Sequence, residues 1–91
     1  MMMKVFSIYD VKAGAYINPF FLPTVGMAVR TFIDCCKDSG HAFGQHPEDY
    51  ALFQLAEFDN QSGNIVDISP EIVLNGLEAV HQANEVNDEN S

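Results

Sequence analysis

The sequence predicts a small α+β domain in which a three-stranded sheet is covered on one face by one main amphipathic helix, in the order β-α-β-β. Three observations lead to this fold class. A long apolar segment, Tyr50–Phe58 (YALFQLAEF), is followed by turn residues at Asp59–Gly63 and a second strand at Ile65–Ile68, which together predict a β-hairpin. Lys4–Asp10 alternates as a strand does, and Thr24–Asp38 has helical periodicity.

The first strand, Lys4–Asp10, places Phe6 and Ile8 on one side and Val5, Ser7 and Tyr9 on the other. The next apolar segment, Ala15–Leu22, is interrupted by Pro19 and followed by Pro23. Because proline cannot donate a ladder hydrogen bond, we expect an irregular or short extended segment whose rings, Tyr16, Phe20 and Phe21, cover the core, in preference to an aromatic stacking platform.

The segment Thr24–Asp38 is the clearest helix. Thr24 follows Pro23 and suits the N-cap position, and Gly40 suits the position just after the helix end. The apolar side chains recur at spacings of three and four residues: Val25, Ala28, Val29, Phe32, Ile33 and Cys36. This stripe predicts the helix face that packs on the sheet.

The strand Tyr50–Phe58 is apolar on both faces, which is typical of a central strand. A single helix covers only one of these faces. We therefore expect the second face to be covered by the Ala15–Leu22 segment, by the carboxy-terminal tail, or by a second copy of the chain in a homodimer.

The carboxy-terminal third gives a less regular pattern. The apolar face of Pro70–Gln82 predicts a helix, although Asn75-Gly76 interrupts the pattern. Residues 1–83 are predicted to form one compact domain, with 69–83 the least regular part, and residues 84–91 to form an acidic, disordered tail.

The net charge of the chain limits the classes of function that it fits. Four Lys and Arg against thirteen Asp and Glu give a net charge of −9, which repels a phosphate backbone and argues against a general nucleic-acid-coating protein. All four cations lie in the first half, so a local nucleic-acid contact patch of Lys4, Lys12, Arg30 and Lys37 is the alternative.

The two cysteines, Cys35 and Cys36, are adjacent and give no disulfide framework, which is consistent with a reducing cytoplasm. The sequence has no signal-peptide pattern and no apolar run near the ~20 residues of a membrane span, so no membrane association is expected.

Cys36, His41 and His46 are separated by four residues each, as in the later part of a zinc knuckle. The first half of that motif is missing, and a cysteine on an apolar helix stripe ordinarily behaves as a small hydrophobe. No metal site, cofactor or catalytic residue is therefore assigned, and the protein is not expected to be an enzyme. A zinc-binding module with Cys36, His41 and His46 as ligands is the least favoured alternative. A histidine in a polar connection more commonly shapes a turn than acts as a general base.

Three stretches carry a family resemblance: Asp10–Gly14 (DVKAG), Phe20–Pro23 (FFLP) and His46–Tyr50 (HPEDY). The last is a motif of His46, Pro47, Glu48, Asp49 and Tyr50. With the sequence around them, from about Lys4 to Ile68, the chain resembles the small nonstructural protein of gokushovirus-type microviruses, which are phages with small single-stranded DNA genomes. The segment from Ser69 onward adds nothing to this resemblance.

The resemblance implies a phage protein that is absent from the virion, acts in the cytoplasm of the infected bacterium, and participates in single-stranded DNA synthesis. It implies no catalytic residue. Combined with the negative charge, it suggests an adaptor that binds the phage replication initiator or procapsid proteins, with direct binding of single-stranded DNA as the second hypothesis.

Overall fold

The computed structural model describes the backbone of residues 1–89 and the side chains of residues 1–84. Within this part of the chain the elements are β1 (Met2–Asp10), β2 (Ala15–Tyr16), β3 (Phe20–Leu22), α1 (Val25–Cys36), α2 (Ala42–Gln45), the 3-10 turn η1 (Pro47–Asp49), β4 (Tyr50–Asp59), β5 (Ile65–Asn75) and α3 (Gly76–Glu89). The mixed class and the central hairpin are as predicted.

The described strands form one antiparallel sheet of five strands, not three, with the order β2-β1-β4-β5 and with β3 also paired to β1. The predicted three-stranded sheet and β-α-β-β order were therefore incomplete. The difference lies in Ala15–Leu22, which pairs with β1 as two short strands. Pro19 falls between them, where no ladder N–H is needed, so it separates the strands without preventing either one.

The hairpin between β4 and β5 was predicted correctly, but β5 is much longer than Ile65–Ile68. The predicted helix from Pro70 to Gln82 was wrong over its first half, which continues the strand to Asn75. Pro70 is tolerated because β5 is an edge strand and its pairing with β4 is irregular opposite Leu55.

Helix α3 begins at Gly76, directly after Asn75, although the sequence pattern predicted that Asn75-Gly76 interrupts a helix. The Asn75 side-chain oxygen accepts a hydrogen bond from the Glu78 N–H at 2.8 Å, which is the role of an N-cap residue. Gly76 is required because a Cβ there would overlap the backbone carbonyl of Pro47. The close approach of two backbones thus fixes where the helix starts.

Helix α1 lies within the predicted range Thr24–Asp38. Thr24 caps it as expected, with its hydroxyl oxygen accepting from the Met27 N–H at 3.2 Å. Gly40 does not have the expected role, since the helix ends at Lys37 in a right-handed conformation and the positive-φ glycines of the described chain are Gly14 and Gly63.

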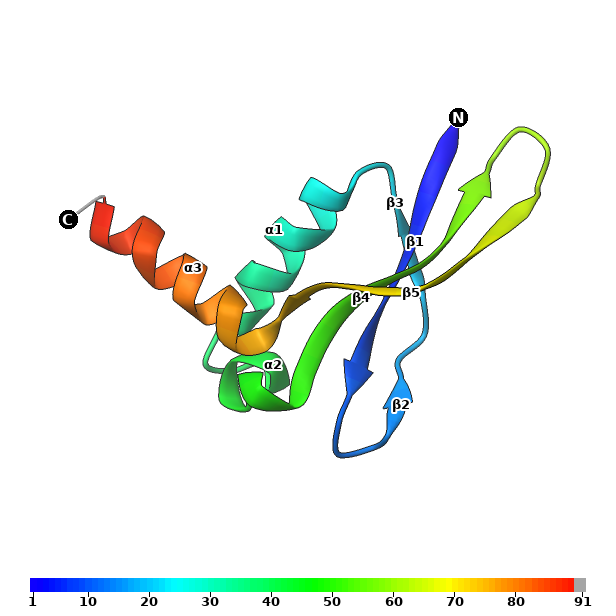
Figure 1. Ribbon diagram of the computed structural model, residues 1–91. Coiled ribbons are helices and arrows are strands. Elements are labelled where there is room, and N and C mark those ends of the chain that lie inside the picture. The colour runs from blue at the N-terminus through cyan, green and yellow to red at the C-terminus, as the bar shows by residue number, and fades with distance from the viewer. Residues whose placement is uncertain (90–91) are drawn as a thin grey trace.

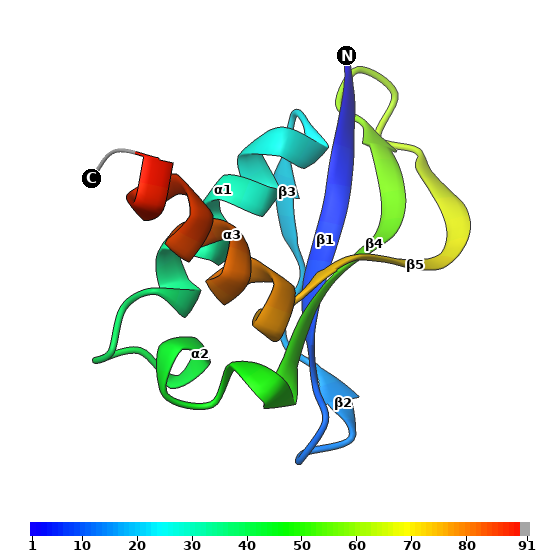
Figure 2. The same cartoon turned by 60° about the vertical axis from the view of Figure 1, so that its left-hand side comes forward.

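The structure has two layers. Figures 1 and 2 show that the helices lie together on one side of the twisted sheet, and α3 packs beside α1. The core lies between these layers and consists of Phe6, Ile8, Ala28, Phe32, Cys36, Leu52, Leu74 and Ala79. The carboxy-terminal helix therefore does not cover the second face of the sheet.

The predicted acidic tail comprises residues 84–91, and the side chains after residue 84 lie outside the described part of the chain. The helix assignment continues to Glu89. Disorder of that tail stays a prediction.

Candidate functional site

The face of the sheet opposite the helices carries a cluster of aromatic rings. Tyr9 on β1, Tyr16 on β2 and Phe53 on β4 contact one another, with ring centroids 4.9 to 6.3 Å apart. Phe21 on β3 and Phe58 on β4 form a second edge-to-face pair at 5.4 Å. We call the surface formed by these five rings and Ile72 of β5, which pairs with Phe53, the open face.

Alternation along the strands creates this surface. On β1, Phe6 and Ile8 are in the core, so Ser7 and Tyr9 face the other way. Side chains also alternate along β3. Phe20 stacks on Phe6 in the helix layer, whereas Phe21 lies on the open face. The sequence predicted that the rings of Tyr16, Phe20 and Phe21 cover the core, which is correct for Phe20 but wrong for Tyr16 and Phe21, whose rings lie on the open face.

The open face is only partly covered. Tyr16 is 41% exposed, Phe21 44% and Ile72 55%, which are high values for large apolar side chains. Ser7 beneath them is fully buried, and its hydroxyl donates to the Ile17 carbonyl at 2.7 Å. The Ala15–Leu22 segment thus shields the middle of the sheet but leaves an apolar surface in contact with water.

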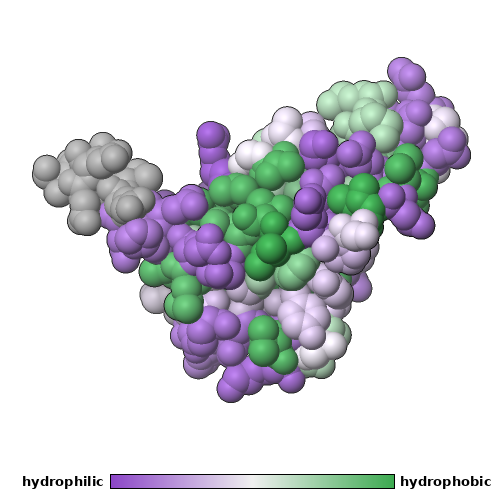
Figure 3. Space-filling view, in the orientation of Figure 1, coloured by the Kyte–Doolittle hydropathy of each residue, from purple (hydrophilic) through white to green (hydrophobic). Residues whose placement is uncertain are grey.

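This apolar surface continues to the edge strand β5. The outer edge of β5 pairs with no other described strand, and Ile65 and Val66 near the hairpin are exposed. A separate hydrophobic surface lies on the helix side, where Figure 3 shows it at α1, bordered by hydrophilic surface. The charged side chains of β5 are Asp67 and Glu71, so this edge is acidic.

The turn at the far end of the hairpin is held by hydrogen bonds within itself. Gly63 adopts the predicted positive φ, +80°, and its N–H donates to the Asp59 carbonyl at 2.8 Å. Hydrogen bonds from the Gln61 N–H and the Ser62 hydroxyl lower the pKa of Asp59. These polar groups are paired within the turn, which closes the predicted hairpin between β4 and β5.

The predicted family-like motif, His46 to Tyr50, forms the corner that leads into β4. Pro47 begins η1, and the Asp49 N–H donates to the His46 carbonyl at 3.0 Å. The Asp49 carbonyl accepts from the Val11 N–H at 2.9 Å, and Pro47 packs against Gly76. The corner therefore connects the start of β4 to the β1–β2 turn and to α3.

The zinc-knuckle spacing does not bring its residues together. Cys36 is buried in the core, where burial and the neighbouring Cys35 raise the pKa of its thiol to about 11. His41 caps α2, with Nδ1 accepting from the Phe43 N–H at 3.0 Å. Among the described residues, Cys36 and His41 belong to no group of three possible metal ligands, whereas His46 lies beside Glu48 and Asp49.

The four cations do not converge on one site. Lys4 pairs with Glu57 at 3.9 Å, and Lys37 pairs with Asp34 at 3.6 Å on the surface of α1. Lys12 lies past the other end of β1, so roughly 20 Å of extended strand separates it from Lys4. Arg30 is on α1, in the helix layer. The described structure therefore contains no compact basic patch built from these residues.

A cavity of about 180 Å³ opens between α1, α2 and the segment before β3. Its lining is apolar apart from Thr31 and Cys35, and includes Ile17, Phe20 and Phe43. Burial, followed by the charges of Asp34 and Asp38, raises the pKa of the Cys35 thiol, which opposes formation of a reactive thiolate. The cavity lacks the converging polar groups that orient a small ligand.

Among the described residues, no helix is long and apolar enough to cross a membrane. Searches of curated proteins and of solved structures give no significant match to this sequence. The model of one protein family, described as Phage ORF5 protein, matches residues 3–79. This match covers the described strands except the first residue of β1, together with the family-like corner and the start of α3, and the chain therefore belongs to the Phage ORF5 protein family.

Proposed function

We propose that this phage protein acts in viral single-stranded DNA synthesis, or in the switch from replication to packaging, as a non-enzymatic adaptor that binds another phage protein through the open face. The process is the one implied by the resemblance to microvirus nonstructural proteins. The observation that carries the binding mode is the sheet face that has no helix over it and exposes Tyr16, Phe21 and Ile72.

Exposed aromatic and aliphatic side chains on a rigid sheet are suited to a protein interface. Aromatic residues are enriched at such interfaces because they bury a large area while losing few rotamers. The edge strand β5 adds a second element, since its free backbone groups are able to pair with a strand of the partner.

The negative charge of the chain favours a partner with a basic surface. The chain has a net charge of −9, and Asp67 and Glu71 line the free edge. A partner with a basic surface gains from both features. The phage replication initiator and the procapsid proteins are the proposed partners, and the adaptor meets them in the cytoplasm of the infected bacterium without becoming part of the virion.

Direct binding of single-stranded DNA is the second candidate. The rings of the open face are favourable for base stacking, but stacking platforms in such proteins accompany a positively charged groove. The scattered positions of Lys4, Lys12 and Arg30 do not supply one.

The two functions are separated by a pull-down from infected host cells with a tagged copy of the full chain, treated with nuclease before elution. The proposal predicts that the replication initiator or a capsid component stays bound after nuclease treatment. Recovery of nucleic acid alone, together with tight binding of single-stranded DNA that weakens steeply with salt, would overturn it.

A further inference from the structure

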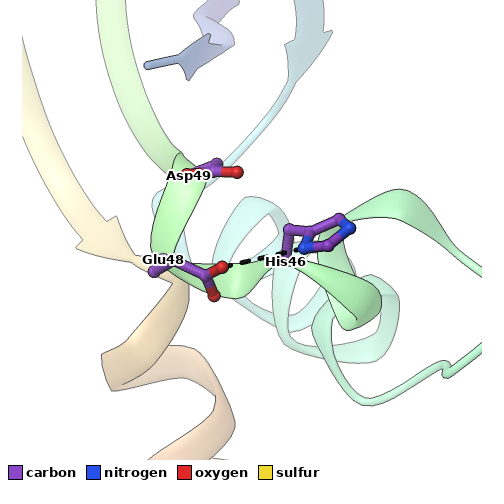
Figure 4. A group of neighbouring side chains, drawn as sticks. All are labelled: His46, Glu48 and Asp49. Carbon is purple, nitrogen blue, oxygen red and sulfur yellow. Dashed lines mark ion pairs between the residues drawn. The ribbon is translucent and has the colours of Figure 1, made fainter. Parts of the chain in front are cut away.

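The corner between α2 and β4 brings together three side chains with metal-ligand chemistry. A nitrogen of His46 and carboxylate oxygens of Glu48 and Asp49 all lie within 4.8 Å of one another. His46 Nδ1 and Glu48 Oε1 are 3.7 Å apart. Figure 4 shows the three side chains at one bend of the chain, with Glu48 directed toward the imidazole.

From this geometry we propose that His46, Glu48 and Asp49 bind a divalent transition-metal ion, with Zn²⁺ as the best fit. One imidazole and two carboxylates suit a borderline ion such as Zn²⁺, whereas Ca²⁺ and Mg²⁺ take oxygen ligands alone. The site differs from the Cys36, His41 and His46 spacing in the sequence, because it shares only His46 with it.

The distances are compatible with this ion. Ligand atoms at about 2.0–2.1 Å from a tetrahedral Zn²⁺ lie about 3.4 Å from one another. The separation of His46 and Glu48 is close to that value, and the Asp49 carboxylate, which lies within 4.8 Å of both, completes the group by a change of its side-chain torsion angles. His46 and Glu48 are exposed and Asp49 is half-buried, so the site opens to solvent on the side of the first two ligands.

The backbone that presents the ligands is already fixed. Pro47 holds one φ angle, the Asp49 N–H and carbonyl are both hydrogen-bonded, and Pro47 is in close contact with Gly76. A preorganised backbone lowers the entropy lost when the ion binds. Three protein ligands leave a fourth position for water or for a ligand from another molecule.

The test uses the full-length chain and Zn²⁺ alone. Imidazole NMR signals of His41, His46 and His81 are recorded while Zn²⁺ is added, and affinity is measured by calorimetry. The proposal predicts that the His46 signals change first. Glu48→Gln and Asp49→Asn are each expected to weaken binding about tenfold or more, since even the loss of groups that support a metal ligand has effects of 10- to 100-fold.

Three controls separate this site from other ways of holding zinc. Glu71→Gln removes the same charge from β5 and is expected to leave the affinity unchanged, which distinguishes a defined site from general attraction by a negative protein. Cys35→Ser is expected to retain binding, because the proposed site contains no thiol. Circular dichroism of each variant shows whether it is folded, and Glu48→Gln changes only an exposed side chain.

Equal changes at all three histidines, loss of binding in Cys35→Ser, or equal weakening by Glu71→Gln would each overturn the proposal. Absence of any change at His46 in excess Zn²⁺ would do so as well. None of these results affects the adaptor function, which depends on the open face.

Discussion

The two faces of the sheet are built from the same strands but are used differently. On the helix side, Phe6 and Leu52 are completely buried, with α1 and α3 over them. On the open face, Tyr16 and Phe21 are exposed by 41% and 44%. Aromatic content is high on both sides, so composition alone does not distinguish them.

The difference separates stability from binding. Side chains of the helix layer gain free energy by leaving water when the chain folds. Those of the open face gain only part of that free energy on folding, and the remainder becomes available when another molecule covers them. A small domain keeps such a surface at a cost in solubility, which its high net charge offsets.

The largest expected effect compares two neighbours in β4. Leu52→Ala is expected to lower the free energy of unfolding by about 2–5 kcal/mol, because it leaves a cavity in the core. Phe53→Ala is expected to cost less, since Phe53 is half-buried and its partners Tyr9 and Tyr16 lie on the open face. Urea unfolding measures both, and an equal or larger loss for Phe53→Ala would contradict the comparison.

Gly76→Ala tests how the helix layer is joined to the corner before β4. The added methyl group would overlap the Pro47 carbonyl, so the variant is expected to lose about 1–3 kcal/mol although alanine favours helices. Thermal unfolding measures this loss. A variant of unchanged or greater stability would show that α3 does not dock here as described.

The N-cap of α1 gives a smaller effect within the same layer. Thr24→Ala removes the side-chain acceptor for the Met27 N–H and is expected to cost about 1 kcal/mol. Thr24→Ser keeps an acceptor and serves as the matched control. The expectation fails if both variants lose the same stability in urea.

A pH-dependent effect concerns the buried cysteine at the end of α1. The folded-state pKa of Cys36, about 11, is above its ordinary value of 9.0. The folded state therefore holds this proton more tightly, so the contribution of Cys36 to stability is complete below pH 9 and is lost as the pH rises to about 11. Between pH 9 and about 11, Cys36→Ala is expected to lose less stability than the unmodified protein, as measured by urea unfolding at each pH.

Thiol labelling compares the same two residues kinetically. Cys36 is buried in the core, whereas Cys35 is partly exposed. At pH 8 a disulfide-exchange reagent is expected to modify Cys35 first and Cys36 only as the protein unfolds. Equal rates in the native protein would mean that the helix layer is open at this end.

Local patterns predicted the central elements well. Alternation predicted β1, a long segment apolar on both faces predicted β4, Gly63 allowed the hairpin turn, and the apolar stripe from Val25 to Cys36 predicted α1. Each of these signals depends on residues close together in the sequence. The same signals also showed that both faces of Tyr50–Phe58 are apolar, which is the feature on which the proposed binding surface depends.

The remaining parts depend on contacts between distant residues. β2 and β3 are too short to be recognised without β1 as their partner, and Pro70 fits in β5 only because that strand is at an edge. Gly76 starts α3 because Pro47, far away in sequence, leaves no room for a side chain. The grouping of His46 with Glu48 and Asp49 required the backbone geometry of η1, whereas spacing alone suggested Cys36 and His41.

The most direct test of the central claim compares two double variants in the nuclease-treated pull-down from infected cells. Tyr16→Ser with Phe21→Ser changes the open face, and Met27→Ser with Leu77→Ser changes exposed apolar residues on α1 and α3. We predict that the open-face variant loses the replication initiator or capsid component while the helix-side variant retains it. Equal recovery by the folded open-face variant, or selective loss by the helix-side variant, would contradict the account.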